Sequence, residues 1–430
     1  MRTEINIAGE DAAGRNYLTW APVRATIKLL EPEGVDPVEV VLGNDDAAHG
    51  GQLEFATARN QPRAATLNLT LPADGSEVEF FVAGEFPKPS SADGDAVVEA
   101  AHAGTGVPLS TTAVMVRIRK DANGLSPAER DRFTTALATL NDSGAGIFRD
   151  FRAMHRQQVA LDQAHGRAGF LSWHRAYLLD LERELQKIDS SVTLPYWRFD
   201  KPAPNVFTPE FMGRSNPGPL GPVTFSPTNL LRNWQTDGQP GITRRPGFDV
   251  LTAKAFVIDD AMTLLLGGPR PNAIFGTGRP FEAFVGMEDN PHGRAHTSFS
   301  GWIHDPPTAP KDPLFFLLHC NADRLWARWQ WFNNRFDGTR ANTFFFRGIA
   351  GDPGAALIGH NLRDTMWPWD NDRVPPRPTN APRTPFPTVP TAPGPGATPT
   401  VGDMIDYQGF LNGRSYTDFG YDDVPYGVAP

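Results

Sequence analysis

The sequence AHGRAGFLSWHRAYL, residues 164–178, is the stretch that says most about the fold, because it carries one histidine near its start and another near its end. From the second histidine onward, residues recur at steps of four, three and four, as on one face of a helix: His174, Leu178, Leu181 and Leu185. We therefore expect a helix whose buried face includes His174. A single histidine on an apolar face is more often a hydrogen-bonded core residue than a metal ligand, so this stretch alone identifies no site.

A second group of histidines lies far downstream. In EDNPHGRAH, residues 288–296, His292 and His296 are four residues apart, which on a helix places two imidazoles over one point of its surface. The pair resembles half of a zinc-protease motif, but that motif needs a glutamate directly after its first histidine, and here the residue is Gly293. His319 follows in the run DPLFFLLHCNADRLW, residues 312–326.

Together with His155 these residues form two histidine triads without a carboxylate or thiolate partner. Imidazole nitrogen binds Cu, Zn, Fe or Ni, whereas a set of this kind disfavours Mg, Ca, Mn and iron–sulfur clusters. Two triads predict two metal ions. Asp323 lies four residues after His319. It could accept a hydrogen bond next to the metal site or form an ion pair with Arg324, and both roles stay open.

These segments resemble the common central domain of tyrosinases, catechol oxidases and related type 3 copper proteins. The resemblance covers roughly Val116 to Ala327 and is most specific from Phe170 to Arg175 and from Asp312 to Trp326. It implies a helical bundle around two Cu ions per chain, with each helix supplying one or two ligands and with O₂ as co-substrate. The metal ligands that it implies are His155, His165 and His174 for one copper, and His292, His296 and His319 for the other.

The resemblance also implies a copper-dependent polyphenol oxidase that converts o-diphenols to o-quinones. Members place a glutamate before the first histidine of the second triad, where it orients a water, and tyrosinases often have asparagine directly after that histidine. Glu288 matches the glutamate and is the catalytic residue we expect, whereas Gly293 has no side chain to assist it. Because only a monophenol needs a base, we expect diphenol oxidation with weak or absent monophenol hydroxylation.

Several alternatives stay open at this stage. They are full monophenolase activity, o-aminophenol oxidation and, more remotely, an oxygen-binding or a zinc-binding protein. Glu288 could instead cap the helix that begins near His292. In plant-type relatives a phenylalanine thirteen residues before the last ligand covers one copper, and here that residue is Pro306, which predicts a more open site.

The single cysteine and four further histidines are expected to lie outside the metal site. Some relatives link a cysteine to the second histidine of the first triad, two residues before it. That position is Gln163 here, so we expect no cross-link and interpret Cys320 as a small buried residue. The remaining histidines are interpreted as surface or hydrogen-bonded residues: His49, His102, His304 and His360.

The expected fold is α+β and multidomain, a mainly α-helical bundle holding a dicopper centre, preceded by a β-sandwich-like N-terminal lobe, with long Pro-rich loops. Period-two alternation between residues 18 and 120 predicts half-buried strands. The sequence Ser126-Pro127-Ala128-Glu129 predicts a capped helix start. We expect three parts: residues 1–110 as the β-rich lobe, 111–372 as the copper-binding catalytic domain, and 373–430 as a Pro-rich arm and aromatic closing segment packed on that domain.

Composition limits the partners. The chain has 430 residues and a net charge of −9, which gives no electrostatic case for binding nucleic acid or an anionic membrane. We expect a cytoplasmic protein, because no signal peptide or spanning apolar segment is visible and the single cysteine agrees with a reducing compartment. The expected partner is a small phenolic substrate, with no nucleic acid and no membrane. A copper-loading partner and the oligomeric state stay open.

Overall fold

The computed structural model covers residues 1–430 and describes all of them except 10, 12, 31–35, 45–49, 167, 267–279, 341, 345–358, 371–385, 387–393, 397, 412, 414–416 and 430. The contacts within the chain divide it into two compact units. Unit 1 comprises Met1–Ile118, Val389–Gly394 and Tyr407–Gly427. Unit 2 comprises Arg119–Thr388, Pro395–Asp406 and Val428–Pro430.

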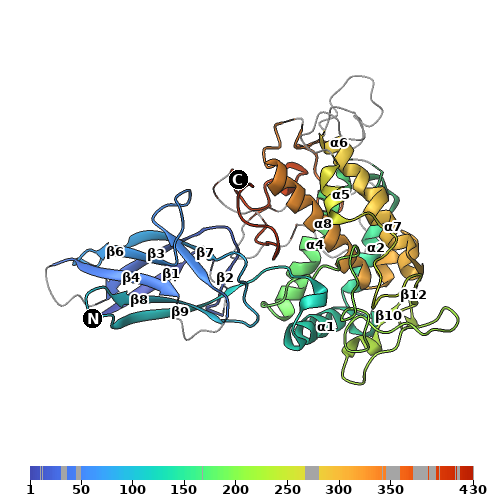
Figure 1. Ribbon diagram of the computed structural model, residues 1–430, viewed down its shortest axis with the longest axis horizontal. Helices are drawn as coiled ribbons and strands as arrows, with labels where there is room; N and C mark the ends of the chain where they lie inside the picture. The colour runs from blue at the N-terminus through green and yellow to red at the C-terminus, as the bar shows by residue number, and fades with distance from the viewer. Residues whose placement is uncertain are drawn as a thin grey trace. The chain divides into compact units, whose positions relative to one another are not determined.

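Unit 1 contains two sheets (Figure 1). The first has the order β1-β3-β7-β5, formed by Arg2–Ile7, Val23–Leu30, Val78–Gly84 and Leu53–Ala56. The second has the order β2-β9-β8-β4-β6, formed by Asn16–Leu18, Pro108–Val116, Ala96–His102, Val38–Asn44 and Thr66–Leu71. Neighbouring strands pair in antiparallel fashion except β2 and β9, which are parallel.

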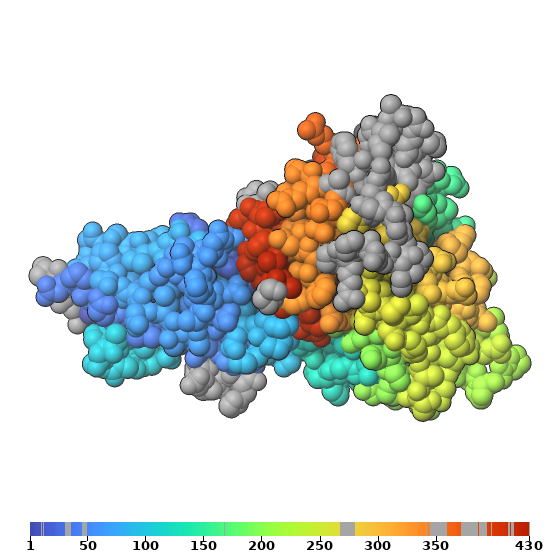
Figure 2. All heavy atoms as spheres, turned by 45° about the horizontal axis from the view of Figure 1, so that its top comes forward, coloured from blue at the N-terminus to red at the C-terminus, as the bar shows by residue number. Residues whose placement is uncertain are grey.

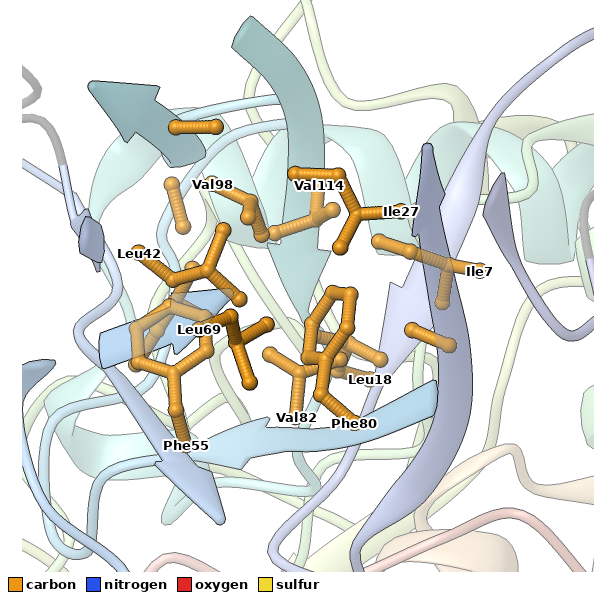
Figure 3. Packing of buried hydrophobic residues seen from close by; sticks show 14 of the residues in the cluster. Ile7, Leu18, Ile27, Leu42, Phe55, Leu69, Phe80, Val82, Val98 and Val114 are labelled. Atoms are coloured by element: carbon orange, nitrogen blue, oxygen red, sulfur yellow. The ribbon is translucent and has the colours of Figure 1, made fainter. Parts of the chain in front are cut away.

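The two sheets of unit 1 share one hydrophobic core. Alternate residues of β3 are buried, as the period-two pattern of its sequence predicts. In the antiparallel register Ala25 of β3 lies opposite Phe80 of β7, so side chains from both strands point to the same side. Figure 3 shows Ile27, Phe80, Leu42 and Val98 meeting between the strands, and all four are fully buried.

The aromatic closing segment lies within Tyr407–Gly427, and its contacts assign it to unit 1. The sequence led us to expect it on the catalytic domain. Trp20 Nε1 donates to the carbonyl oxygen of Tyr421 at 2.8 Å, and Arg117 pairs with Asp418 at 3.1 Å. In Figure 2 the spheres of this segment (red) lie against those of the β strands (blue). Tyr416 and most of the Pro-rich arm lie outside the described residues.

Unit 2 has a helical core, which confirms the predicted bundle. Its α-helices are α1 Pro127–Asn141, α2 Phe148–His155, α3 Gln158–Ala164, α4 Gly169–Ile188, α5 Asp260–Leu265, α6 Pro280–Phe284, α7 Arg294–Thr297 and α8 Leu314–Asn333. The two long helices α4 and α8 pack against each other, α1 and α3 pack on α4, and α5 packs on α8 (Figure 1). Among the described residues, no helix combines the length and apolar character needed to cross a bilayer.

Local signals account for the start of the bundle. Ser126 Oγ accepts from the amide of Glu129 at 3.3 Å, and Glu129 Oε2 accepts from the amide of Ser126 at 3.0 Å, so the predicted capping box is present. Between the helices lie short strands: β10 Gln235–Thr236, β11 Gln239–Pro240, β12 Arg244–Pro246 and β13 Phe299–Gly301.

A buried charge network joins α4 to α8. Arg175 Nε on α4 donates to Asp323 Oδ1 on α8 at 2.6 Å. Arg119 Nη2 donates to Glu182 Oε2 at 2.6 Å, while its Nη1 donates to Asp323 Oδ2 at 3.3 Å. All four side chains are at most 2% exposed. Asp323 therefore acts as a structural ion-pair partner, and its pairs are with Arg175 and Arg119.

Arg324 links α8 to α5. Its Nη1 donates to Asp260 Oδ2 and to Asn321 Oδ1, both at 2.9 Å. Removing one member of a buried ion pair typically costs about 3–5 kcal/mol, because the other charge is left uncompensated. The packing of α4, α5 and α8 is thus fixed by charge as well as by apolar contact.

Candidate metal centre

Six histidines of unit 2 gather in two triads, and within each triad the ligand atoms lie within 4.8 Å of one another. The first triad consists of His155 at the end of α2, His165 directly after α3, and His174 in α4. The second triad consists of His292 in the π-helical turn Asp289–Gly293, His296 in α7 and His319 in α8. The rings of His174 and His319 stack with centroids 4.2 Å apart, so the triads adjoin.

The second triad converges on one point. The Nε2 atoms of His292 and His296 lie 3.1 and 3.2 Å from Nε2 of His319. Nδ1 of His292 donates to the carbonyl oxygen of Glu288 at 2.8 Å, and Nδ1 of His296 donates to that of Ile303 at 2.7 Å. Because a carbonyl oxygen can only accept, these protons lie on Nδ1, and each Nε2 presents a lone pair, as in metal-binding histidines.

The first triad is less regular. His174 Nδ1 donates to the carbonyl oxygen of Phe170 at 2.8 Å, and its buried Nε2 has no hydrogen-bond partner among the described residues. The Nε2 atoms of His155 and His165 lie 3.3 Å apart. His165 has extended backbone and is followed by Gly166 at φ +71°, so the chain leaves the helical path here. His165 is therefore supplied by the loop after α3, whereas the expected bundle has its helices supply one or two ligands each.

Burial keeps five of the six imidazoles neutral. Loss of solvation lowers the pKa of His155, His174, His292 and His319 well below the usual value, and the neighbouring histidines lower it further. The pKa of His296 falls to about 4, mainly through burial. Since a metal binds the neutral ring, these unpaired and converging nitrogens fit two metal ions.

Glu288 contacts the loop of the first triad. The amide of Gly166 donates to both carboxylate oxygens, at 2.7 and 2.9 Å, and His165 Nδ1 lies 3.3 Å from Oε1. The helix-capping alternative is wrong, because the Glu288 side chain makes no capping hydrogen bond to the turn that follows it. Spacing could not have revealed this contact, since a backbone amide leaves no mark in the sequence.

A cleft of about 530 Å³ gives access to the histidines. Its lining includes five of the six ligands, Glu288, Gly293 and Phe315, whose ring stacks on His319 at 4.0 Å. Pro306 also lines the cleft and is exposed. His304 also lines the cleft, and its Nδ1 donates to the carbonyl oxygen of Phe299 at 2.7 Å.

The remaining expectations concern residues away from the cleft. Cys320 is fully buried, and its Sγ lies 3.5 Å from the carbonyl oxygen of Leu194, as expected of a small core residue. Gln163 Oε1 accepts from the amide of Trp367 at 2.9 Å. His102 and His360 are hydrogen-bonded, as expected, whereas His49 lies outside the described residues.

Residues 145–332, which contain all six histidines, match the family model described as the common central domain of tyrosinase. A tyrosinase of Streptomyces glaucescens is 33% identical over 275 residues, which cover 60% of this chain and 94% of the relative. The chain belongs to the tyrosinase family. Members of this family are oxidoreductases with two copper ions and typically use O₂, and the two triads fit such a dicopper site.

Other members of the family are similar over comparable lengths. A tyrosinase of Streptomyces galbus is 31% identical over 277 residues, covering 60% of this chain and 94% of the relative. The grixazone synthase of Streptomyces griseus is 29% identical over 265 residues, covering 50% and 85%. Among solved structures, a tyrosinase from Burkholderia thailandensis covers 71% of this chain and 75% of its own, with 20% identity and a TM-score of 0.40.

Proposed function

We propose that this tyrosinase-family protein is a polyphenol oxidase that uses O₂ to oxidise o-diphenols to o-quinones, with weak monophenol ortho-hydroxylation. The ligands proposed for one copper are His155, His165 and His174, and those for the other are His292, His296 and His319. When bound, two adjacent coppers supply the binding of O₂ and the exchange of two electrons. The protein residues hold the metals, shape the cleft and take up protons.

The surroundings of Glu288 are the observation on which we base the preference for o-diphenols over monophenols. A monophenol, with a pKa of about 10, must lose its proton before it can be hydroxylated. The single amide of Gly166 is shared between both oxygens of Glu288, which orients the carboxylate toward the loop of the first triad and leaves acceptor sites for a water that carries the proton. Gly293 offers no side chain to orient that water. Deprotonation of a monophenol is therefore poorly assisted.

We further propose that the cleft accepts bulky phenols. Pro306, which is exposed, lines the cleft together with Phe315 and five of the imidazoles, and it offers no large ring there. An aromatic substrate can stack on Phe315 and the imidazoles, and a stacked pair contributes about 0.5–1.5 kcal/mol beyond the area that it buries.

An activity panel on copper-loaded protein tests the proposal. We expect rapid oxygen uptake with 4-tert-butylcatechol and slow uptake, after a lag, with the corresponding monophenol. Equal rates for both would make the protein a tyrosinase with full monophenolase activity. Preference for an o-aminophenol would instead make it an o-aminophenol oxidase. Reversible oxygen binding without turnover would indicate a carrier, and metal analysis that finds zinc instead of copper would overturn the oxidase.

A further inference from the structure

We propose that the segment Gly359–Trp367, here called the brace, positions His165 for copper binding, and that His360 is the positioning residue through which it acts. The inference rests on the proposed function, because it requires a copper ion at the first triad. It assigns a role to a histidine that is not a ligand and that lies far from the ligands in the sequence.

His165 is the ligand that most needs support. The other five lie in helical segments, whereas His165 follows the last residue of α3 in extended conformation. Its side chain is 24% exposed, while the other five residues are at most 9% exposed. From His165 the chain leads into α4, which begins at Gly169, through Gly166, which has a left-handed backbone. Nothing in the local helical geometry therefore fixes its ring.

His360 connects the two ends of the loop that carries His165. Its Nδ1 accepts from the amide of Gly169, the first residue of α4, at 3.0 Å. Its Nε2 donates to the carbonyl oxygen of Asp162, in the last turn of α3, at 2.9 Å. The residue is only 2% exposed. One imidazole thus determines the separation of the two helix ends between which His165 lies.

Two further hydrogen bonds join the brace to the same region. Gln163 Oε1, two residues before His165, accepts from the amide of Trp367 at 2.9 Å. Trp173 Nε1, next to the ligand His174, donates to the carbonyl oxygen of Trp367 at 2.7 Å. The brace therefore contacts residues on both sides of His165 and beside a second ligand.

Two glycines allow the brace to approach this closely. A Cβ on Gly169 would lie 2.6 Å from the carbonyl oxygen of Gly359 and 2.8 Å from His360 Nδ1. A Cβ on Gly359, whose φ is +93°, would lie 2.8 Å from Cγ and Cδ of Gln163. Since real Cβ contacts of this length do not occur, a side chain at either position would push the brace away from the loop.

The brace has a fixed shape of its own. Asp364 Oδ2 accepts from the amides of Gly359, His360 and Asn361, at 2.9, 3.2 and 3.1 Å. A carboxylate that gathers successive amides in this way holds them in a tight turn. His360 is therefore presented to the His165 loop from a preformed turn, and the loop gains order from it.

The test uses three substitutions of His360 in the full-length protein. His360→Ala removes both hydrogen bonds. His360→Asn places an amide near the position of Nδ1, and His360→Gln places one near Nε2, so each can restore one bond. His102→Ala is the matched control, because His102 also accepts a backbone amide, from Gly104 at 3.1 Å, but in an exposed turn of unit 1.

The measurements are copper per chain after dialysis against a mild chelator, and the melting temperature of the copper-free protein. For His360→Ala we expect one of the two coppers to be lost about tenfold faster, as is usual when the residue supporting a metal ligand is removed. The copper-free melting temperature should change little. His360→Asn or His360→Gln should recover part of the retention, and His102→Ala should match the wild type.

The outcomes separate the brace from the proposed function. If the wild type itself does not hold two coppers, the proposed function fails. If the wild type holds two and His360→Ala releases them at the wild-type rate, only the role of the brace is overturned. Equal loss of both coppers together with a large drop in the copper-free melting temperature would also overturn it, because His360 would then stabilise the whole unit.

Discussion

The two histidine triads offer the same kind of ligand but are organised differently. In the second triad all three histidines lie in helical segments, and two of them donate Nδ1 protons to main-chain carbonyl oxygens nearby. In the first triad His165 lies in a loop, and its surroundings come from Glu288 and, through the loop ends, from His360. The second triad is thus ordered by nearby backbone, whereas the first depends on distant segments at His165.

This difference suggests how a binuclear site can combine affinity with access. A preorganised ligand set holds its metal tightly because little order has to be gained on binding. A ligand in a partly exposed loop can yield to a substrate or a metal donor at lower cost. We expect the first triad to be the adaptable half of the site and the second to be the permanent half.

The largest expected effect follows from removing a ligand. His319→Ala and His165→Ala should each reduce catechol oxidation to background, because a single copper cannot accept both electrons of a diphenol. Copper per chain should fall from two to about one in both variants. Metal analysis and oxygen uptake check this, and turnover in either variant would remove that histidine from the ligand set.

Chelation distinguishes the two halves without mutation. Under a mild chelator we expect two phases of copper loss, with the faster phase about tenfold quicker and belonging to the first triad. Variants identify the phases, because His165→Ala should lack the fast phase and His319→Ala the slow one. A single phase in the wild type would mean that the difference in organisation has no effect on affinity.

The copper-free protein should be sensitive to acid. The folded state lowers the pKa of five ligand histidines, so below about pH 6.5 the unfolded state takes up protons that the folded state does not. The histidines therefore do not reduce the free energy of unfolding above pH 6.5. Below that pH the free energy of unfolding falls by about 1.4 kcal/mol per pH unit for each histidine. For His296 the fall continues to about pH 4.

Denaturant unfolding of the copper-free protein between pH 8 and pH 5 checks this dependence. His296→Gln should reduce the slope by the share of one histidine. A flat profile would show that the copper-free triads take up solvent and lose their burial.

The side chain of Glu288 contacts the loop of the first triad, and its carbonyl oxygen accepts from His292 of the second, so its replacement tests both halves. Glu288→Gln keeps an acceptor for the amide of Gly166 but loses the negative charge next to His165 Nδ1. We expect copper retention at the first triad to fall several-fold and monophenol turnover to fall more than diphenol turnover. Equal losses for both phenols would leave Glu288 as a support for His165 alone.

The smallest effect concerns Gly293. Proton-transfer assistance can provide roughly 10² to 10⁴-fold, but Gly293→Asn should raise monophenol turnover by much less than this. Its backbone is helical, at φ −59°, but a Cβ would lie 3.1 Å from the carbonyl oxygen of Glu288, which accepts from His292 Nδ1. Some strain on His292 should limit the gain. The ratio of monophenol to diphenol rates is the measurement, and an unchanged ratio would contradict the role of this position.

What the sequence could predict depended on whether the signal was local. The period of His174 and Leu178 predicted α4, Ser126 and Glu129 predicted the start of α1, and the residues around the histidines indicated the two triads. The contacts of Glu288 with Gly166 and of His360 with Gly169 could not be predicted. They join segments far apart in the chain through backbone amides, which no spacing or residue type records.

The charge network between α4 and α8 also matters for the design of shorter proteins. Arg119 is the first residue of unit 2, yet it is fully buried and donates to both Glu182 and Asp323. A truncated enzyme that starts at residue 120 would keep every copper ligand but leave two carboxylates inside the bundle with one cation fewer. Such a fragment should express poorly even when copper is supplied, whereas one that starts a few residues before Arg119 retains the arginine that neutralises them.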